Sequence, residues 1–160
     1  MKETERIADQ LRRAFDGDTW AGPSLQDTLV DVTAAQAAAH PLAGVHSIGE
    51  LVRHLTTWAA TVAQRVEQQQ LTPPAGDDWP VFAAEPSEGA WQQARQALTR
   101  AQERLLAATV ALPDAALDTV LGEVRDPAQG SGVSCYVLLH GAVQHYLYHA
   151  GQIALLRKFL

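Results

Sequence analysis

The sequence predicts an all-α protein, a four-helix bundle with long connections between its helices. Ala, Leu, Val, Gln and Arg dominate the chain, which is 47% hydrophobic and only 6% aromatic, and this composition favours helix over sheet. Four segments also repeat apolar residues with the period of a helix. A length of 160 residues suits one domain with a sizeable core, so we expect residues 1–160 to form a single helical domain.

The first helix is expected from about Lys2 to Phe15. Ile7, Leu11 and Phe15 are four residues apart and so share one helix face, and the Asp-Gly-Asp sequence that follows ends the pattern. The connector after it is expected to contain one short helix, from Leu25 to Val32.

The second helix is expected to begin after Ser47. Ser47 and Glu50, three residues apart, form a capping-box pattern that accounts for both side chains. The helix should extend to about Gln70, where two prolines and a glycine follow.

The third helix is expected from near Ser87 to just before Pro113, because proline interrupts helical hydrogen bonding. A polar, glycine-rich link follows. The fourth helix should then run from about Val133 to Phe159.

The charge distribution argues against nucleic acid as a partner. The chain has 12 basic and 18 acidic residues, a formal charge of -6, and its arginines are scattered along helices rather than clustered. We therefore expect a small molecule as substrate.

Cysteine use and hydropathy indicate the compartment. Cys135 is the sole cysteine, which excludes an intramolecular disulfide and favours a reducing compartment, where we expect this thiol to be a small core residue. The N-terminal segment is charged and no apolar run approaches the length of a membrane span. The protein is thus expected to be cytoplasmic, with no membrane partner.

Two histidines stand out in the fourth helix. His145 and His149 are four residues apart, so their imidazoles leave the same helix face one turn apart. Gln152 shares that face with an apolar stripe, where polar groups are unfavourable unless partners satisfy them. The pair is therefore either a set of metal ligands or two hydrogen-bonded core histidines.

A third histidine lies on the second helix. His54 is at the flank of the apolar stripe of that helix, in the sector of Glu50 and Trp58. It is expected to point into a cleft beside the core, where it would complete a group of three histidines.

These regions resemble the two signature regions of the DinB family of helical-bundle proteins, many of which are metalloenzymes. In the first region the matching residues are Ser47, Ile48, Glu50, Leu51, His54 and Trp58, and in the second they are His145, His149, Gly151 and Gln152. Ala150 departs from the pattern, because many relatives place a polar residue there. The resemblance follows the helix order over nearly the whole chain.

The resemblance implies an antiparallel four-helix bundle that holds a divalent metal through His54, His145 and His149 at one end of a pocket. Imidazole ligands suit Zn²⁺ or Ni²⁺, and three of them leave an open coordination position.

Four further residues are candidates for the pocket or for supporting the ligands. Gly141 removes a side chain from the pocket wall, and Gln152 is placed to orient a histidine or to tie two helices together. Trp58 is a candidate pocket wall. Glu50 is a candidate for supporting the ligands, although the helix cap already explains it.

Three functions are compatible with such a site. Related proteins include bacillithiol transferases and the mycothiol-dependent maleylpyruvate isomerase, so the first hypothesis is a metal-dependent thiol S-transferase in detoxification, with a low-molecular-weight thiol as cofactor. The second is a metal-dependent hydrolase. The third is a non-catalytic, stress-associated bundle that binds metal or a small ligand as a homodimer.

Overall fold

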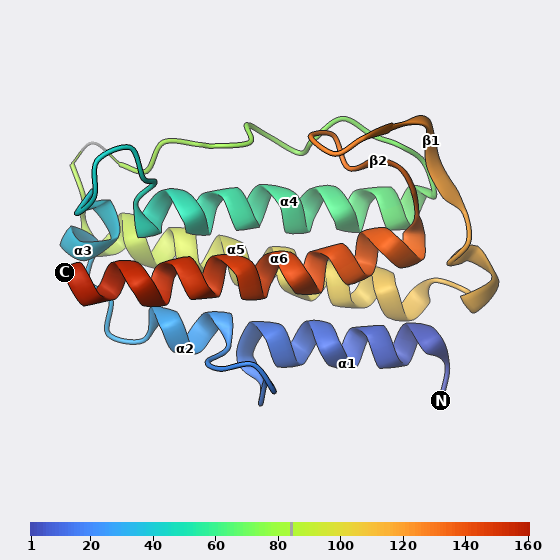
Figure 1. The fold of residues 1–160 in the computed structure, drawn as a ribbon, viewed down its shortest axis with the longest axis horizontal. Helices are drawn as coiled ribbons and strands as arrows, with labels where there is room; N and C mark the ends of the chain where they lie inside the picture. The colour runs from blue at the N-terminus through green and yellow to red at the C-terminus, as the bar shows by residue number, and fades with distance from the viewer. Residues whose placement is uncertain (84) are drawn as a thin grey trace.

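Four long helices lie side by side in the computed structural model, which describes residues 1–83 and 85–160 (Figure 1). They are α1 (Glu3–Asp16), α4 (Ile48–Gln68), α5 (Glu88–Ala111) and α6 (Cys135–Leu156). The short elements are α2 (Leu25–Leu29), α3 (Ala34–Ala38) and the 3₁₀ turns η1 (Asp114–Ala116) and η2 (Arg157–Phe159). The prediction of a mostly helical protein is confirmed. No helix in the described ranges is both long enough and apolar enough to span a membrane.

The expectation of an all-α chain is wrong in one segment. The link before the last helix contains two antiparallel strands, β1 (Val120–Asp126) and β2 (Ser131–Ser134). The usual alternation of a strand is obscured here, because Gly122, Gly130 and Gly132 all adopt positive φ and the register shifts within the hairpin. Leu121 is nevertheless buried in the core.

The connector before α4 also differs from its prediction. The short helix ends at Leu29 rather than Val32, and a second helix, α3, follows it. Thr33 caps α3, since its side chain accepts from the backbone N–H of Gln36 and the Gln36 side chain accepts from Thr33 in return. This capping box was present in the sequence and predicts the helix start.

The helices do not alternate in direction as an antiparallel bundle would. After α4 the chain turns back along it: Thr72 contacts Arg65, Ala75 contacts Thr61 and Val81 contacts Arg53. The returning segment delivers α5 to the starting end of α4, so these two helices run in the same direction, while α1 and α6 run opposite to them (Figure 1). We call residues 69–83 the return segment.

The N-terminus of α4 forms as its sequence predicts. The Ser47 side chain accepts from the Glu50 N–H at 3.2 Å, and the Glu50 carboxylate accepts from the Ser47 N–H at 2.9 Å. The helix then buries Leu51, Leu55 and Val62 in the core that it shares with α6. This fixes the rotation of α4 about its axis, and with it the direction of His54.

Candidate metal centre

Three histidine side chains meet between α4 and α6. His54 comes from α4, and His145 and His149 come from α6, one helical turn apart. The Nε2 atom of His145 lies 2.9 Å from the Nε2 atom of His54 and 2.9 Å from that of His149. Their candidate ligand atoms all lie within 4.8 Å of one another. We call these three residues the histidine triad.

The outer nitrogens of two triad members are held by hydrogen bonds. His54 Nδ1 donates to the Asp78 backbone carbonyl at 2.6 Å, and His149 Nδ1 donates to Gln152 Oε1 at 2.6 Å. A neutral imidazole carries one N–H, so in both residues the hydrogen is on Nδ1 and Nε2 presents a lone pair. Both lone pairs point at His145 Nε2.

This arrangement leaves the three imidazoles one hydrogen short. His145 Nε2 supplies at most one hydrogen, to His54 or to His149, so at least one 2.9 Å contact sets lone pair against lone pair. A cation would satisfy all three nitrogens at once. The donor set fits a metal on distance as well, because imidazole nitrogens at ~2.1 Å from one ion lie roughly 3 to 3.5 Å apart.

Burial keeps the triad neutral. Desolvation, with a smaller contribution from the neighbouring imidazoles, lowers the pKa of His145 to about 3. Desolvation likewise lowers the pKa of His149 to about 4, against the opposing effect of its hydrogen bond to Gln152. Desolvation also lowers the pKa of His54, against the opposing effect of Asp78. Neutral imidazole is the form that binds metals, so protons do not compete for these nitrogens at neutral pH.

The return segment supplies two contacts to the triad that no pattern in the sequence predicted. Asp78 Oδ1 accepts from Trp58 Nε1 at 2.6 Å and lies 3.2 Å from His54 Nδ1. The Trp79 ring stacks on the His54 ring, with 3.9 Å between their centroids. The His46 ring also stacks on Trp79, with 3.7 Å between their centroids. A carboxylate and a tryptophan within a proline-rich stretch were the available signal, but their position depends on the segment folding back along α4.

The predicted pocket residues fall into two groups. Gln152 contacts His149, while Trp58 and Gly141 line a cavity that also exposes His54 and His145. Glu50 is placed elsewhere: its carboxylate serves the α4 cap and contacts His40 and His46 at 3.1 and 3.3 Å. No contact between Glu50 and the triad is present in residues 1–83 and 85–160.

The cavity beside the triad has a volume of about 500 Å³, a size typical of small-molecule sites. Its walls come from α4, the return segment, the β1–β2 hairpin and α6. Most of the lining is apolar, including Val62, Val133 and Leu138. We call it the triad cavity.

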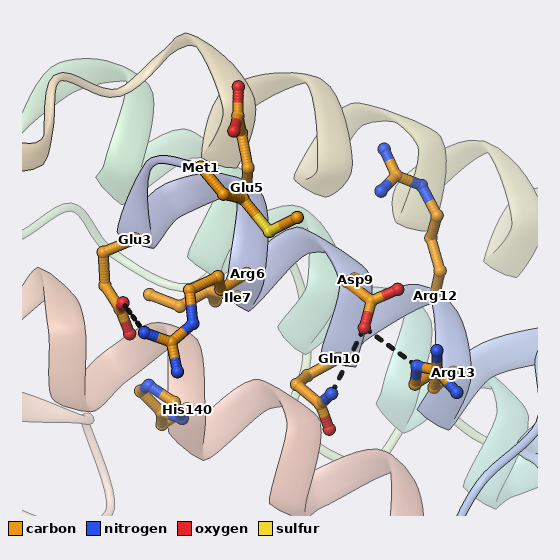
Figure 2. Close-up of a pocket in the computed structure, with 10 residues that line it drawn as sticks. All are labelled: Met1, Glu3, Glu5, Arg6, Ile7, Asp9, Gln10, Arg12, Arg13 and His140. Carbon is orange, nitrogen blue, oxygen red and sulfur yellow. Dashed lines mark hydrogen bonds and ion pairs between the residues drawn. The ribbon is translucent and has the colours of Figure 1, made fainter.

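A second hollow, of about 680 Å³, lies over α1 (Figure 2), and none of the triad residues lines it. Its lining is mostly charged, and four of these charges form ion pairs along the helix surface: Arg6 with Glu3 at 3.2 Å and Arg13 with Asp9 at 2.8 Å. His140 of α6 contributes to it and is half-buried. Paired, solvent-exposed side chains of this kind are typical of an ordinary helix surface.

Cys135 lies outside both hollows. The thiol is buried at the start of α6, and desolvation raises its pKa, so it stays protonated and unreactive.

The fold and the family are established by comparison with known proteins. A conserved protein of Enterococcus faecalis has a similar crystal structure, with a TM-score of 0.69 and 18% identity over 99% of this chain and 97% of that one. At this identity the likeness shows the fold alone. No curated protein matches the chain. The model of the DinB superfamily matches residues 19–153. The chain therefore belongs to the DinB superfamily.

Proposed function

We propose that the histidine triad binds a divalent transition metal, Zn²⁺ or Ni²⁺, and that the protein is a metal-dependent thiol S-transferase. The main support for the metal site is that the two contacts among the three Nε2 atoms share at most one hydrogen, so one hydrogen bond cannot form; we call this the hydrogen shortfall. Such a shortfall is unfavourable in a buried site unless a cation occupies it.

The residues around the triad have separate tasks in this proposal. Asp78 and Gln152 hold His54 and His149 with their Nε2 lone pairs turned inward. Trp79 covers one face of His54 and limits the approach of water. When bound, a metal with three imidazole ligands supplies an open position that lowers the pKa of a thiol and holds it as the nucleophilic thiolate.

Thiol transfer is favoured over hydrolysis by the lining of the triad cavity. Hydrolysis of a substrate by metal-bound water usually needs a general base in reach. Among the described residues that line the cavity, Asp78 is the sole acid, and Trp58 and His54 already occupy its carboxylate. A hydrolase, or a non-catalytic homodimer that binds metal in the stress response, is the alternative.

Metal analysis of purified protein tests the site. We expect about one equivalent of metal in the wild type, a large loss in His149→Ala and no loss in His140→Ala, which removes a histidine from the same helix outside the triad. Equal metal content in the wild type and His149→Ala would refute the site.

Thiol chemistry is tested on the cobalt-loaded protein. Titration with 2-mercaptoethanol should add a thiolate-to-cobalt absorption band, and the loaded protein should speed the reaction of the thiol with 1-chloro-2,4-dinitrobenzene. A metal-containing protein that shows neither effect would favour the hydrolase or the non-catalytic alternative.

A further inference from the structure

The triad cavity has an arginine in its lining that no part of the proposed thiol chemistry uses. Arg125, on β1, lines the cavity together with His54 and His145. Within residues 1–83 and 85–160 it forms no ion pair, and its Nη1 donates only to the Ser131 carbonyl, at 3.3 Å. A guanidinium without a carboxylate partner beside a cavity is free to bind an anion.

The hairpin holds Arg125 in this position. Gly132 has φ of +67°, and a Cβ there would lie 2.6 Å from the Arg125 Cα, so only glycine lets β2 pass this close. On the neighbouring residue, the Ser131 hydroxyl donates to the Val124 carbonyl at 2.9 Å. The arginine therefore projects from a backbone fixed by both strands.

A second cation lies behind the cavity wall. The Arg65 side chain is fully buried, and among the residues that the structure describes it donates only to backbone carbonyls, those of Thr72 at 2.8 and 3.0 Å and of Gln129 at 2.6 Å. A Cβ on Gly130, which lines the cavity, would lie 3.2 Å from Arg65 Nη1. The positive charge of Arg65 is thus close to the cavity and is not neutralised by a carboxylate in the described structure.

The local charge is opposite to that of the whole chain. The formal charge of the protein is -6, which by itself disfavours anions. At the triad cavity, however, the two positive charges are those of Arg125 in the lining and Arg65 behind the wall. Asp78 is the sole acid among the described lining residues, and its carboxylate already contacts Trp58 and His54. The remaining wall is largely apolar. These features suit a ligand with one acidic group and an apolar body.

We propose that the triad cavity binds a small organic acid, with its carboxylate on Arg125 and its apolar body against Trp58 and Leu138. The proposal rests on the proposed function in one respect, that the triad is the reactive centre beside which the acid is held. Arginine suits this task because its planar guanidinium can donate two parallel hydrogen bonds to a carboxylate. The acid group belongs either to the thiol or to the electrophile that the thiol attacks.

The test compares 4-phenylbutyrate with its uncharged amide, 4-phenylbutyramide, in calorimetric titrations of metal-free and zinc-loaded protein. In the wild type we expect the acid to bind at least tenfold more tightly than the amide, a difference of about 1.4 kcal/mol. Arg125→Gln should abolish the preference and Arg125→Lys should keep part of it. Arg100→Gln is the matched control, since it removes the same charge from an exposed arginine on α5, and it should keep the full preference.

The outcomes separate this proposal from the proposed metal site. A preference for the acid that survives Arg125→Gln, or that is absent from the wild type, would overturn the proposal. If that surviving preference appears only with zinc, the acid binds the metal, which supports the metal site and still refutes the role of Arg125. A preference that depends on Arg125 in a protein that takes up no zinc would support the acid site and refute the proposed function.

A second titration identifies which reactant carries the acid. On cobalt-loaded protein, 3-mercaptopropionate is compared with 2-mercaptoethanol in the wild type and in Arg125→Gln. If Arg125 strengthens binding of 3-mercaptopropionate alone, the acid belongs to the thiol. If the two thiols bind alike and only 4-phenylbutyrate depends on Arg125, the acid belongs to the electrophile. If neither acid depends on Arg125, the proposal is wrong.

Discussion

One side-chain amide determines where the hydrogen of His149 lies. Gln152 Oε1 accepts from His149 Nδ1 at 2.6 Å and so leaves Nε2 as a lone pair directed at His145. Leucine at position 152 has a similar size but accepts no hydrogen bond, which frees His149 to rotate and to change tautomer. We expect Gln152→Leu to weaken zinc binding by about 10- to 100-fold.

Competition with a chromophoric zinc chelator measures this affinity. Gln144→Leu is the control, because Gln144 is an exposed amide on the same helix that also lines the triad cavity, and its side chain forms no hydrogen bond with a triad residue in the described structure. Equal affinities of the two variants would mean that Gln152 ties helices together without supporting the ligand.

The buried imidazoles also make the metal-free protein sensitive to acid. In the folded state the pKa of His145 is about 3 and that of His149 about 4, against 6.5 for an ordinary histidine. Below pH 6.5 the unfolded chain therefore binds protons that the folded protein does not, and the free energy of unfolding decreases as the pH falls. Each histidine contributes a slope of at most about 1.4 kcal/mol per pH unit.

Urea denaturation between pH 7 and pH 5, with a chelator present, tests this slope. His145→Gln cannot titrate, so its free energy of unfolding should fall less steeply than that of the wild type over this range. Parallel curves for the two proteins would show that His145 is not held neutral by burial.

At the scale of elements, α4 depends on a close contact near its first turn. A Cβ on Gly49 would lie 2.4 Å from the ring of Phe82, a buried residue of the return segment. We expect Gly49→Ala to displace this ring and to lower the free energy of unfolding by roughly 1–3 kcal/mol. Thermal and urea unfolding measure the change.

Gly151 on α6 provides the matched control. It also lies within a long helix, but a Cβ there meets nothing within 4 Å. Gly151→Ala should therefore raise the free energy of unfolding by about 0.5–1 kcal/mol, because alanine loses less backbone entropy in a helix. The same sign for both substitutions would contradict the proposed packing of Phe82 on α4.

At the scale of the whole molecule, Arg65 joins three parts of the chain: α4, the return segment and the hairpin. From α4 it donates to Thr72 in the return segment and to Gln129 at the hairpin. Methionine would fill a similar volume but leave the buried Thr72 carbonyl and the Gln129 carbonyl without this donor. We expect Arg65→Met to lower the free energy of unfolding by roughly 2–4 kcal/mol.

Arg104→Met is the control for Arg65→Met. Arg104 makes two hydrogen bonds to Glu67, but both side chains are exposed to solvent, so its replacement should lower the free energy of unfolding by less than about 1 kcal/mol. Urea denaturation of both variants makes the comparison. Similar losses would show that the buried arginine stabilises the fold no more than a surface ion pair.

The sequence by itself determined the elements whose signals are local. Helical periodicity predicted α1, α4, α5 and α6, and the Ser47–Glu50 pair predicted where α4 begins, because both depend on neighbours three or four residues away. The same spacing placed His145 and His149 on one face. His54 joined them through its helix position and through the resemblance to the family.

Only the tertiary structure decided what depends on residues distant in sequence. The parallel direction of α4 and α5, the approach of Asp78 and Trp79 to His54, and the placement of Arg125 in the triad cavity all follow from where the return segment and the hairpin pack. Periodicity carries no information on such packing, because it reports which face of an element is buried and not which element covers it. The hydrogen shortfall of the triad likewise appears only once three side chains and their partners are placed together.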